Sequence, residues 1–276
     1  MTKRAACAGL LLAGLVSLAG APARAANVQL DDLTWTEVRD GLRAGTTTVI
    51  IPVGGTEQNG PHMALGKHNV RAAALSARIA AKLGHTLVAP VMPYVPEGRI
   101  SPPAGHMRFP GTISVPEAAF ASVLAGAARS LKQHGFLDIV LVGDSGNYQE
   151  QLKDIAARLN REWAGTGARA HYVAAYYEAG TAGFAQALRA RGITETQIGT
   201  HAGLADTSLL MAIDESRVRA DRLAAPGAAN PASGVTGEPS QSSAALGRIG
   251  VDMIIDRTAA AIRLAIAGRK PAASRE

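Results

Sequence analysis

The run Thr-Thr-Thr-Val-Ile-Ile-Pro-Val at residues 46–53 is followed at once by Gly54-Gly55. Its β-branched residues fit a pleated strand, and the glycine pair marks a tight turn. A second apolar run at residues 137–142 leads into Gly-Asp-Ser-Gly-Asn at residues 143–147. Short continuous apolar runs bounded by turn residues indicate buried strands. The two runs therefore predict two strands of a buried sheet.

Segments with helical spacing of apolar residues alternate with these strands. We expect helices at residues 33–42, with Asp31 or Asp32 as the N-cap, and at 69–84, 116–135, about 149–163 and about 241–268. Short strands are expected near residues 86–92 and at about 169–176. Strands that alternate with helices of this length imply parallel βαβ units. The expected fold class is therefore α/β, a three-layer α/β/α sandwich with a mostly parallel central sheet.

Residues 26–276 are expected to form a single domain. The stretch at 224–240 is rich in Pro, Gly, Ala and Ser, but only one helix follows it, which is too little for a second domain. We interpret this stretch as a surface or active-site loop. Residues 93–114 are rich in Pro, Gly and His and have no clear period. A loop of that length in a compact domain is usually functional or disordered.

Residues 1–25 have the pattern of a secretory signal peptide. Lys3 and Arg4 precede the apolar run from Leu10 to Leu18, and small residues at 23–25 offer a cleavage site. The apolar run is too short to span a bilayer as a stable helix. We therefore expect an exported protein, periplasmic or secreted, that has no membrane attachment after cleavage. The only cysteine, Cys7, lies in this segment, so the mature chain has neither disulfides nor a thiol nucleophile.

The charge balance gives no support for a polyanionic partner. The formal charge is +6, and removal of the three basic residues in the signal segment, which holds no acid, lowers it to +3. The remaining sequence has no run rich in Lys and Arg. We expect a small-molecule substrate and no nucleic acid.

Polar side chains follow both central strands at the point where each strand ends. The first turn presents Glu57, Asn59, His62 and His68, and the second presents Asp144, Ser145 and Asn147. Ligands of open parallel sheets bind beyond the carboxyl ends of the strands, so the two sets should meet at one edge. Such a mixture of carboxylate and imidazole suits Zn²⁺, Mn²⁺ or Fe²⁺. The simpler alternative is that Glu57 and Asp144 only cap the helices that follow them.

All of these residues except His68 lie within motifs that resemble those of the creatininase (creatinine amidohydrolase) family, and five such motifs occur in order along the chain. The motifs are Pro-Val-Gly-Gly-Thr-Glu-Gln-Asn-Gly-Pro-His at 52–62, His106 with Phe-Pro-Gly-Thr at 109–112, Gly-Asp-Ser-Gly-Asn at 143–147, His-Ala-Gly at 201–203 with Asp-Thr-Ser at 206–208, and Gly-Val-Thr-Gly-Glu-Pro at 234–239. The resemblance spans about residues 45–260. It implies a three-layer α/β/α fold, a centre of one or two metal ions, hydrolysis of amide C–N bonds and a homo-oligomer, commonly a hexamer.

The resemblance also assigns roles by position. Glu57 matches a metal-binding glutamate, and Asp206 matches a glutamate beside the metal. His201 matches a histidine that transfers protons near the scissile bond. The family has a metal-bridging aspartate at the position of His68, a metal-binding histidine at Asp144 and a further histidine ligand at Asn59. Asp206 is expected to be a fourth ligand or a base that orients water.

The departures at His68 and Asp144 exchange a carboxylate and an imidazole, so their combined donor set is kept. Glu57, His68, Asp144 and Asp206 are therefore expected to bind one divalent ion of Zn, Mn or Fe. Because Asn59 is a much poorer ligand than histidine, a single ion is favoured over two. Contacts with the substrate are expected from His62, His106, Asn59, Ser145 and Tyr177.

The function favoured by these patterns is hydrolysis of an amide C–N bond, in a small cyclic amide, through a metal-activated water. A lactone or ester would suit the same chemistry. Because several ligand positions have changed, a non-catalytic member of the family that binds a small molecule is a second interpretation. A third is a serine hydrolase in which Ser145 is the nucleophile and His201 the base.

Overall fold

The computed structural model describes residues 27–223 and 230–268, so the predicted signal segment at 1–25 lies outside the described residues. The strands are β1 Thr48–Val53, β2 Thr86–Val88, β3 Asp138–Gly143 and β4 Arg169–Tyr172. The longer helices are α1 Trp35–Arg43, α2 Lys67–Leu83, α3 Glu117–Gln133, α4 Gln149–Glu162, α8 Leu204–Asp214 and α9 Ala244–Ala267. The shorter ones are α5 Ala175–Glu178, α6 Phe184–Arg189 and α7 Glu195–Ile198, with a π-helical turn at Ala179–Gly183 that links α5 to α6.

The sheet has the order β2-β1-β3-β4, and all of its pairings are parallel. β1 and β3 lie at its centre and pair along their whole length, from Thr48 opposite Asp138 to Val53 opposite Gly143. Every residue of both strands is buried, as their continuous apolar sequences predict. The expected α/β class with a parallel central sheet is confirmed.

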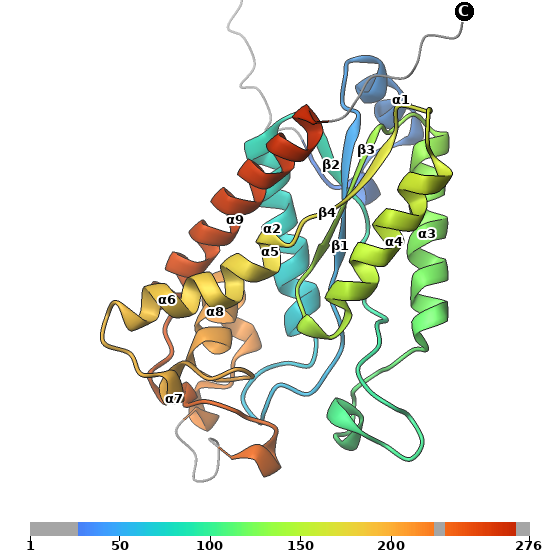
Figure 1. The fold of residues 1–276 in the computed structure, drawn as a ribbon. Helices are drawn as coiled ribbons and strands as arrows, with labels where there is room; N and C mark the ends of the chain where they lie inside the picture. Colours follow the sequence, from blue (N-terminus) through green and yellow to red (C-terminus); the bar gives the residue numbers. More distant parts are fainter. Residues whose placement is uncertain (1–26, 224–229, 269–276) are drawn as a thin grey trace, which may run out of the picture.

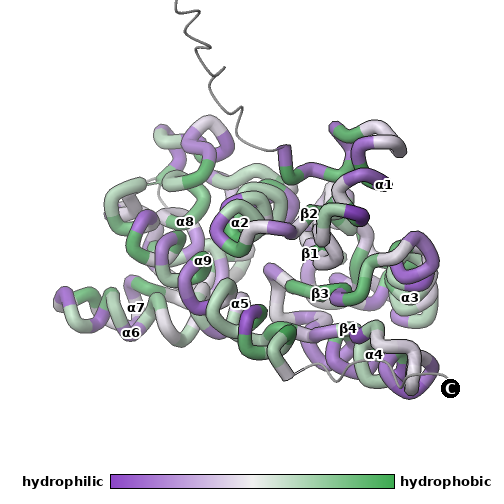
Figure 2. Tube along the Cα trace, turned by 90° about the horizontal axis from the view of Figure 1, so that it is seen from above, coloured by the Kyte–Doolittle hydropathy of each residue, from purple (hydrophilic) through white to green (hydrophobic). Residues whose placement is uncertain are grey.

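Helices cover both faces of this sheet and give three layers (Figures 1 and 2). Side chains alternate along each strand, so Val49 and Ile51 of β1 pack in the core under α3 and α4. Ile50 lies in the opposite core, to which α2 and α9 contribute Leu75 and Ile254. The C-terminal helix α9 also packs against α8 and α5, so it connects the helices that cover this face of the sheet.

Several element boundaries differ from the sequence expectations. The N-cap of α1 is Thr34, not Asp31 or Asp32, because its hydroxyl accepts from Glu37 N and Glu37 caps its amide in return. β2 ends at Val88, two residues before Pro90, and β4 ends at Tyr172 instead of continuing to about residue 176. The helices α5 to α8 were not expected. None of the helices within the described residues combines the length and the apolarity needed to cross a membrane.

The connections at the carboxyl ends of the strands carry the chemistry. The segment after β1 runs from Gly54 into α2, and the segment after β3 runs through Asp144 into α4. The long stretch at 93–114 is irregular apart from a 3₁₀ turn at Gly105–Arg108, and it pairs with the segment after β1 where Thr56 faces Ile113. On the other side, Thr236 pairs with His201. Both long loops predicted from composition therefore reach the same edge of the sheet.

Candidate active site

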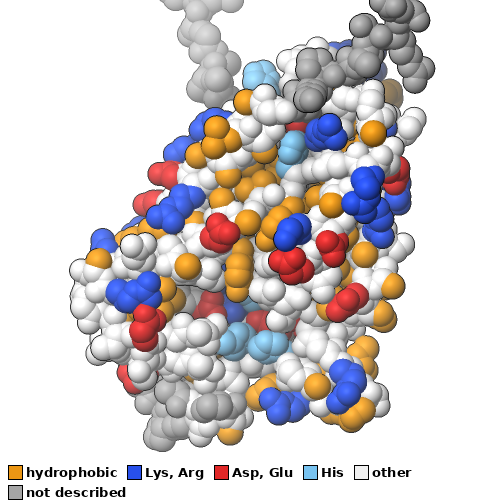
Figure 3. Space-filling model, viewed as in Figure 1, with side chains coloured by type: hydrophobic (Ala, Val, Ile, Leu, Met, Phe, Trp, Pro, Cys, Tyr) orange, Lys and Arg blue, Asp and Glu red, His pale blue; other side chains and the backbone are white. Residues whose placement is uncertain are grey.

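A cavity of about 220 Å³ lies at this edge, and charged and imidazole side chains line it. Its walls include Glu57, His106, Asp144, His201 and Asp206. Figure 3 shows histidine side chains together with acidic and basic ones in a hollow on the lower part of the molecule. The parallel pairing of β1 with β3 brings the two turns together, as predicted.

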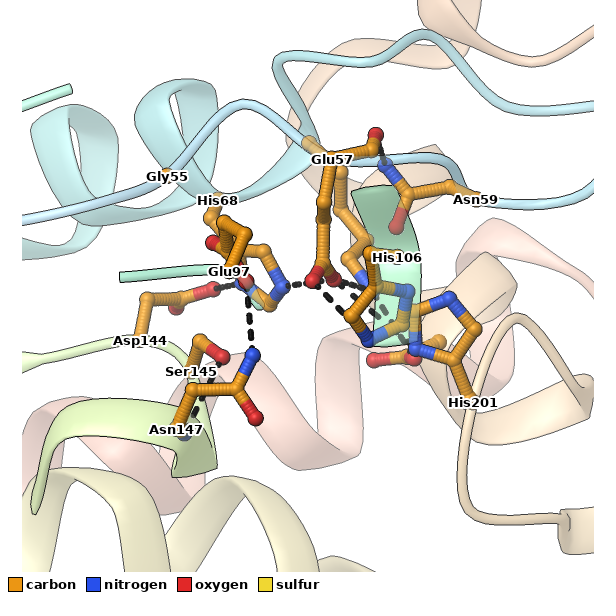
Figure 4. Close-up of polar contacts among 12 residues, drawn as sticks. Gly55, Glu57, Asn59, His68, Glu97, His106, Asp144, Ser145, Asn147 and His201 are labelled. Atoms are coloured by element: carbon orange, nitrogen blue, oxygen red, sulfur yellow. Dashed lines mark hydrogen bonds and ion pairs between the residues drawn. The ribbon is translucent and has the colours of Figure 1, made fainter. Parts of the chain in front are cut away.

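His68 connects the two carboxylates that follow the central strands (Figure 4). Its Nε2 lies 2.8 Å from Glu57 Oε1, and its Nδ1 lies 2.6 Å from Asp144 Oδ1. An ionised carboxylate only accepts hydrogen bonds, so both ring nitrogens donate and His68 is an imidazolium. Burial lowers the pKa of His68, but the charge of Glu57 and the two hydrogen bonds outweigh it and the pKa is raised.

Both oxygens of Asp144 already contact protein donors. Its Oδ1 also lies 3.1 Å from Arg71 Nε, and its Oδ2 accepts from the Tyr176 hydroxyl at 2.8 Å. Although burial raises the pKa of Asp144, Arg71 and His68 lower it below its ordinary value. The predicted metal ligands His68 and Asp144 are therefore bonded to each other and to protein donors, an arrangement that does not surround a common point.

Asp206 is paired with two cations from the start of α2. Lys67 Nζ lies 3.0 Å from Asp206 Oδ2, and Arg71 Nη1 lies 2.8 Å from Asp206 Oδ1. Lys67 Nζ is also 3.7 Å from Glu57 Oε1. Although its partial burial raises the pKa of Asp206, these cations lower it well below the usual value, so this carboxylate does not take up protons at neutral pH.

Glu57 also lies close to two further histidines. His106 Nε2 lies 3.3 Å from Glu57 Oε2, and His201 Nδ1 lies 3.8 Å from Glu57 Oε1. Burial lowers the pKa of both rings, that of His201 to about 4, so both are neutral at pH 7. One ligand atom from each of the three residues lies within 4.8 Å of the other two.

Gln58 holds the two rings in place. Its Oε1 accepts from Gly60 N at 2.9 Å, and its Nε2 donates to the carbonyl oxygen of Gly234 at 3.1 Å. The same Nε2 lies 3.0 Å from His106 Nδ1 and 3.1 Å from His201 Nε2. His201 Nε2 is also 3.0 Å from the backbone oxygen of Gln58, to which it can donate. In that tautomer the Nδ1 of His201 carries a lone pair on the side of Glu57.

Glu97, in the long loop after β2, is a second buried carboxyl group next to Glu57. Asn147 Nδ2 donates to its Oε2 at 2.6 Å. Burial and the nearby charge of Glu57 raise the pKa of Glu97 to about 8. With both groups ionised, Glu57 Oε2 and Glu97 Oε1 have no hydrogen-bond partner among the described residues. A proton on Glu97 removes this conflict, because it can be donated to the Glu57 carboxylate.

The donor set formed by Glu57, His106 and His201 fits one divalent transition metal. Two neutral imidazoles and one carboxylate are a ligand set of catalytic zinc sites, which leave a position open for water. His201 Nε2 can donate to the backbone oxygen of Gln58, as metal-binding histidines usually donate their other ring nitrogen, whereas His106 Nδ1 accepts from the Gln58 side-chain amide. A metal ion would also satisfy the buried oxygen of Glu57 that has no donor when Glu97 is ionised.

The predicted substrate contacts fall into two groups. Ser145 and Tyr177 line the cavity together with His106. Asn59 and His62 are fully buried outside it: Asn59 Nδ2 donates to the backbone oxygen of Glu57 at 2.9 Å, and His62 Nε2 lies 3.0 Å from Thr207 Oγ1. These contacts favour a role in ordering the turn over contact with substrate.

Ser145 has no geometry of a nucleophile. Its Oγ accepts from Asn147 N at 3.4 Å, which caps the short turn after β3. Among the described residues, no histidine hydrogen-bonds to this hydroxyl, so the pair of Ser145 with His201 finds no support.

Three residues of the site were missed from the sequence: Lys67, Arg71 and Glu97. The sequence holds a signal for the first two, since they lie four residues apart at the start of a helix with no acid in its first turn. Cations are unfavourable at a helix N-terminus, so two of them there indicate carboxylate partners elsewhere. Nothing in the local sequence distinguishes Glu97 from an exposed loop glutamate.

Comparisons with known proteins agree with the motifs. The family model Creatininase, described as creatinine amidohydrolase, matches residues 31–262. The creatinine amidohydrolase of Pseudomonas putida is 29% identical over 203 residues, covering 71% of this chain and 76% of that protein. The mycofactocin precursor peptide peptidase of Mycolicibacterium smegmatis is 28% identical over 187 residues, 66% of this chain and 64% of that protein. A solved structure described as "Creatininase Mn" has a TM-score of 0.70 at 25% identity and covers 87% of this chain and 99% of its own.

Proposed function

Because the chain belongs to the creatininase family of metal-dependent amidohydrolases, we propose that it hydrolyses the amide C–N bond of a small cyclic amide. The observation that carries the proposal is the convergence of Glu57, His106 and His201 on the 220 Å³ cavity. A cavity of this volume is below the usual range for drug-sized ligands and suits a small molecule. Two of the relatives are a creatinine amidohydrolase and a peptide peptidase, and both of these names refer to hydrolysis of an amide bond.

A divalent ion held by Glu57, His106 and His201 would supply a Lewis acid and lower the pKa of water to near neutrality. The residues of the chain then have separate tasks. Gln58 orients both imidazoles, and His68 fixes the carboxylate of Glu57 through Oε1. Ser145 and Tyr177 line the cavity and are available for contact with a substrate.

The proposal is tested by metal content and turnover measured on the same preparations. We expect wild-type protein purified with Zn²⁺ or Mn²⁺ to carry one ion per chain and to hydrolyse members of a panel of lactams and other cyclic amides. Glu57→Gln and His106→Ala should each lower the ion content and reduce turnover by roughly 100-fold or more. The matched control is His134→Ala, because His134 is an exposed residue that caps α3 outside the cavity.

His201 has two candidate roles, and one variant separates them. We propose that it binds the ion, since its neutral ring lies beside Glu57. His201→Ala should then lose the ion together with the activity. Retention of a full ion with loss of turnover would assign His201 to proton transfer instead. Wild-type protein that binds no Zn²⁺ or Mn²⁺ would contradict the hydrolase and favour a binding protein.

Export and assembly also stand as proposals, carried by the signal pattern at residues 1–25 and by the family resemblance. Fractionation of cells that produce the full chain should recover it outside the cytoplasm, shortened by about 25 residues. Light scattering of the purified protein should give a mass several times the monomer value.

A further inference from the structure

Lys67 and Arg71 place two positive charges where the site gathers its carboxylates. Lys67 Nζ lies between Asp206 Oδ2, at 3.0 Å, and Glu57 Oε1, at 3.7 Å. Arg71 contacts Asp144 Oδ1 through Nε, at 3.1 Å, and Asp206 Oδ1 through Nη1, at 2.8 Å. Each of the three carboxylates therefore contacts at least one of these two cations, and Asp206 contacts both.

Among the described residues, the ion pairs of these two side chains are all made with the three carboxylates. Lys67 is 1% exposed and Arg71 is 4% exposed, so water does not solvate either charge. Both belong to the first two turns of α2, where the helix dipole opposes a cation. Buried charges are costly unless they are paired, and breaking such a pair is strongly destabilising. The carboxylates of Glu57, Asp144 and Asp206 are the groups that make this arrangement possible.

This pairing limits how many ions the cavity can hold. His106 Nε2 approaches Glu57 Oε2, which no Lys or Arg contacts within the described residues, whereas Lys67 and His201 both approach Oε1. An ion bound through Oε2 therefore avoids direct contact with the ammonium group of Lys67. By contrast, a dication between Glu57 and Asp206 would meet the ammonium group of Lys67, which is already 3.0 Å from Asp206. Like charges at such a distance in a buried site repel strongly.

We propose that Lys67, together with Arg71, is a built-in cation that takes the charge position of a second metal ion between Glu57 and Asp206. The site then holds one ion and keeps its carboxylates in place when that ion is removed. The single ion rests on the function proposed above, whereas the exclusion of a second ion rests on the contacts of Lys67 alone.

The test is the number of ions bound by Lys67→Met, which keeps the length of the side chain and removes its charge. After dialysis against Mn²⁺ or Zn²⁺, elemental analysis should give one ion per wild-type chain and one additional ion per Lys67→Met chain. The metal-free variant should melt at a lower temperature than the metal-free wild type, and added Mn²⁺ should restore most of the loss. The control is Lys82→Met: Lys82 lies on the same helix and pairs with Asp256, but it is 43% exposed. It should behave as wild type.

A second variant covers the case in which Lys67→Met folds only with metal. Lys67→Arg keeps the positive charge and should keep the wild-type ion count, and Lys67→Met refolded in Mn²⁺ is then counted against it. Two ions bound to the wild-type chain, or equal counts in wild type and Lys67→Met, would overturn the proposal. If wild type binds no ion while Lys67→Met binds one, the built-in cation stands and the function proposed above fails.

Discussion

At the scale of single residues, Gln58 shows how one side chain determines the geometry of others. Its amide group contacts both His106 and His201 while it is itself fixed by Gly60 and Gly234. Second-shell groups of this kind typically change metal affinity by about 10–100-fold. We expect Gln58→Met to weaken Zn²⁺ or Mn²⁺ binding by that factor, as measured by competition with a chelating dye. An unchanged dissociation constant would show that Gln58 does not orient the rings.

Glu97 gives a second prediction at this scale, which concerns stability. Its pKa rises from an ordinary value of 4.5 to about 8 in the folded chain, so its protonated form is the stable one. Such a group contributes stability below pH 4.5 that is lost as the pH rises to about 8. Glu97→Gln mimics the protonated form without titrating. In a chelator, the variant should gain stability relative to wild type between pH 5 and pH 8, by up to a few kcal/mol. Equal differences at both pH values would contradict the assignment.

Some contacts of single residues in the site could be predicted from the sequence, and others could not. The segments that carry Glu57 and Asp144 meet because two parallel strands end together, so the pattern of apolar runs in the sequence was enough to predict their contact. The exchange of carboxylate and imidazole at 68 and 144 was also visible, but the hydrogen bonds that use both ring nitrogens of His68 were not. Glu97 depends on a loop conformation fixed by contacts with Ser114 and Asn147, which no local pattern encodes.

At the scale of elements, the packing of α9 against α8 depends on glycine. A Cβ atom at Gly247 would lie 1.8 Å from the backbone oxygen of Ser208, and one at Gly250 would lie 2.7 Å from Leu209 Cδ2. The backbone oxygen cannot move aside as a side-chain end can. We expect Gly247→Ala to lower the free energy of unfolding by roughly 1–3 kcal/mol or more, as overpacked cores do. Urea unfolding measures it.

Gly126 in α3 is the matched control for that prediction, because a Cβ atom there meets nothing within 4 Å. Gly126→Ala in a helix should leave stability unchanged or raise it by about 0.5–1 kcal/mol. If both alanine variants were equally stable, the close approach of α8 and α9 would not be real.

The elements found from sequence are those with a strong period or a continuous apolar run. The helices α2, α3, α4 and α9 lie within a few residues of the expected ranges. The short helices between Ala175 and Ile198 were missed because each has only four to six residues, too few to show an apolar stripe of its own. Contacts with α9 support part of this segment: Gly180, in the π-helical turn, lies against Ile254, more than 70 residues away in the sequence.

At the scale of the whole molecule, the charged groups of the site form a balanced set. Glu57, Asp144 and Asp206 carry negative charges, and Lys67, Arg71 and the imidazolium of His68 carry positive ones. Such a network needs no external ion to be neutral. The chain therefore combines the parallel fold and ordered motifs of its family with a site whose charges are largely internal, which sequence patterns of ligand residues alone do not reveal.

Because these buried groups have shifted pKa values, the free energy of unfolding should depend on pH. The pKa of His201 falls from 6.5 to about 4 on folding, so the buried neutral ring costs stability as the pH falls below 6.5. As the pH falls below 6.5, His201 lowers the free energy of unfolding while protonated Glu97 raises it, so the two effects oppose each other. The lowered pKa values of His62 and His106 lower the free energy of unfolding further. Above pH 6.5 these histidines no longer contribute, while Glu97 and His68, whose pKa values are raised, both lose their stabilising protons.

In a chelator, the free energy of unfolding should peak near pH 6.5 and fall by about 1–3 kcal/mol per pH unit toward pH 8. Urea unfolding at four pH values from 5 to 8 measures the curve, and a steady rise across that range would contradict the charge states assigned to the site.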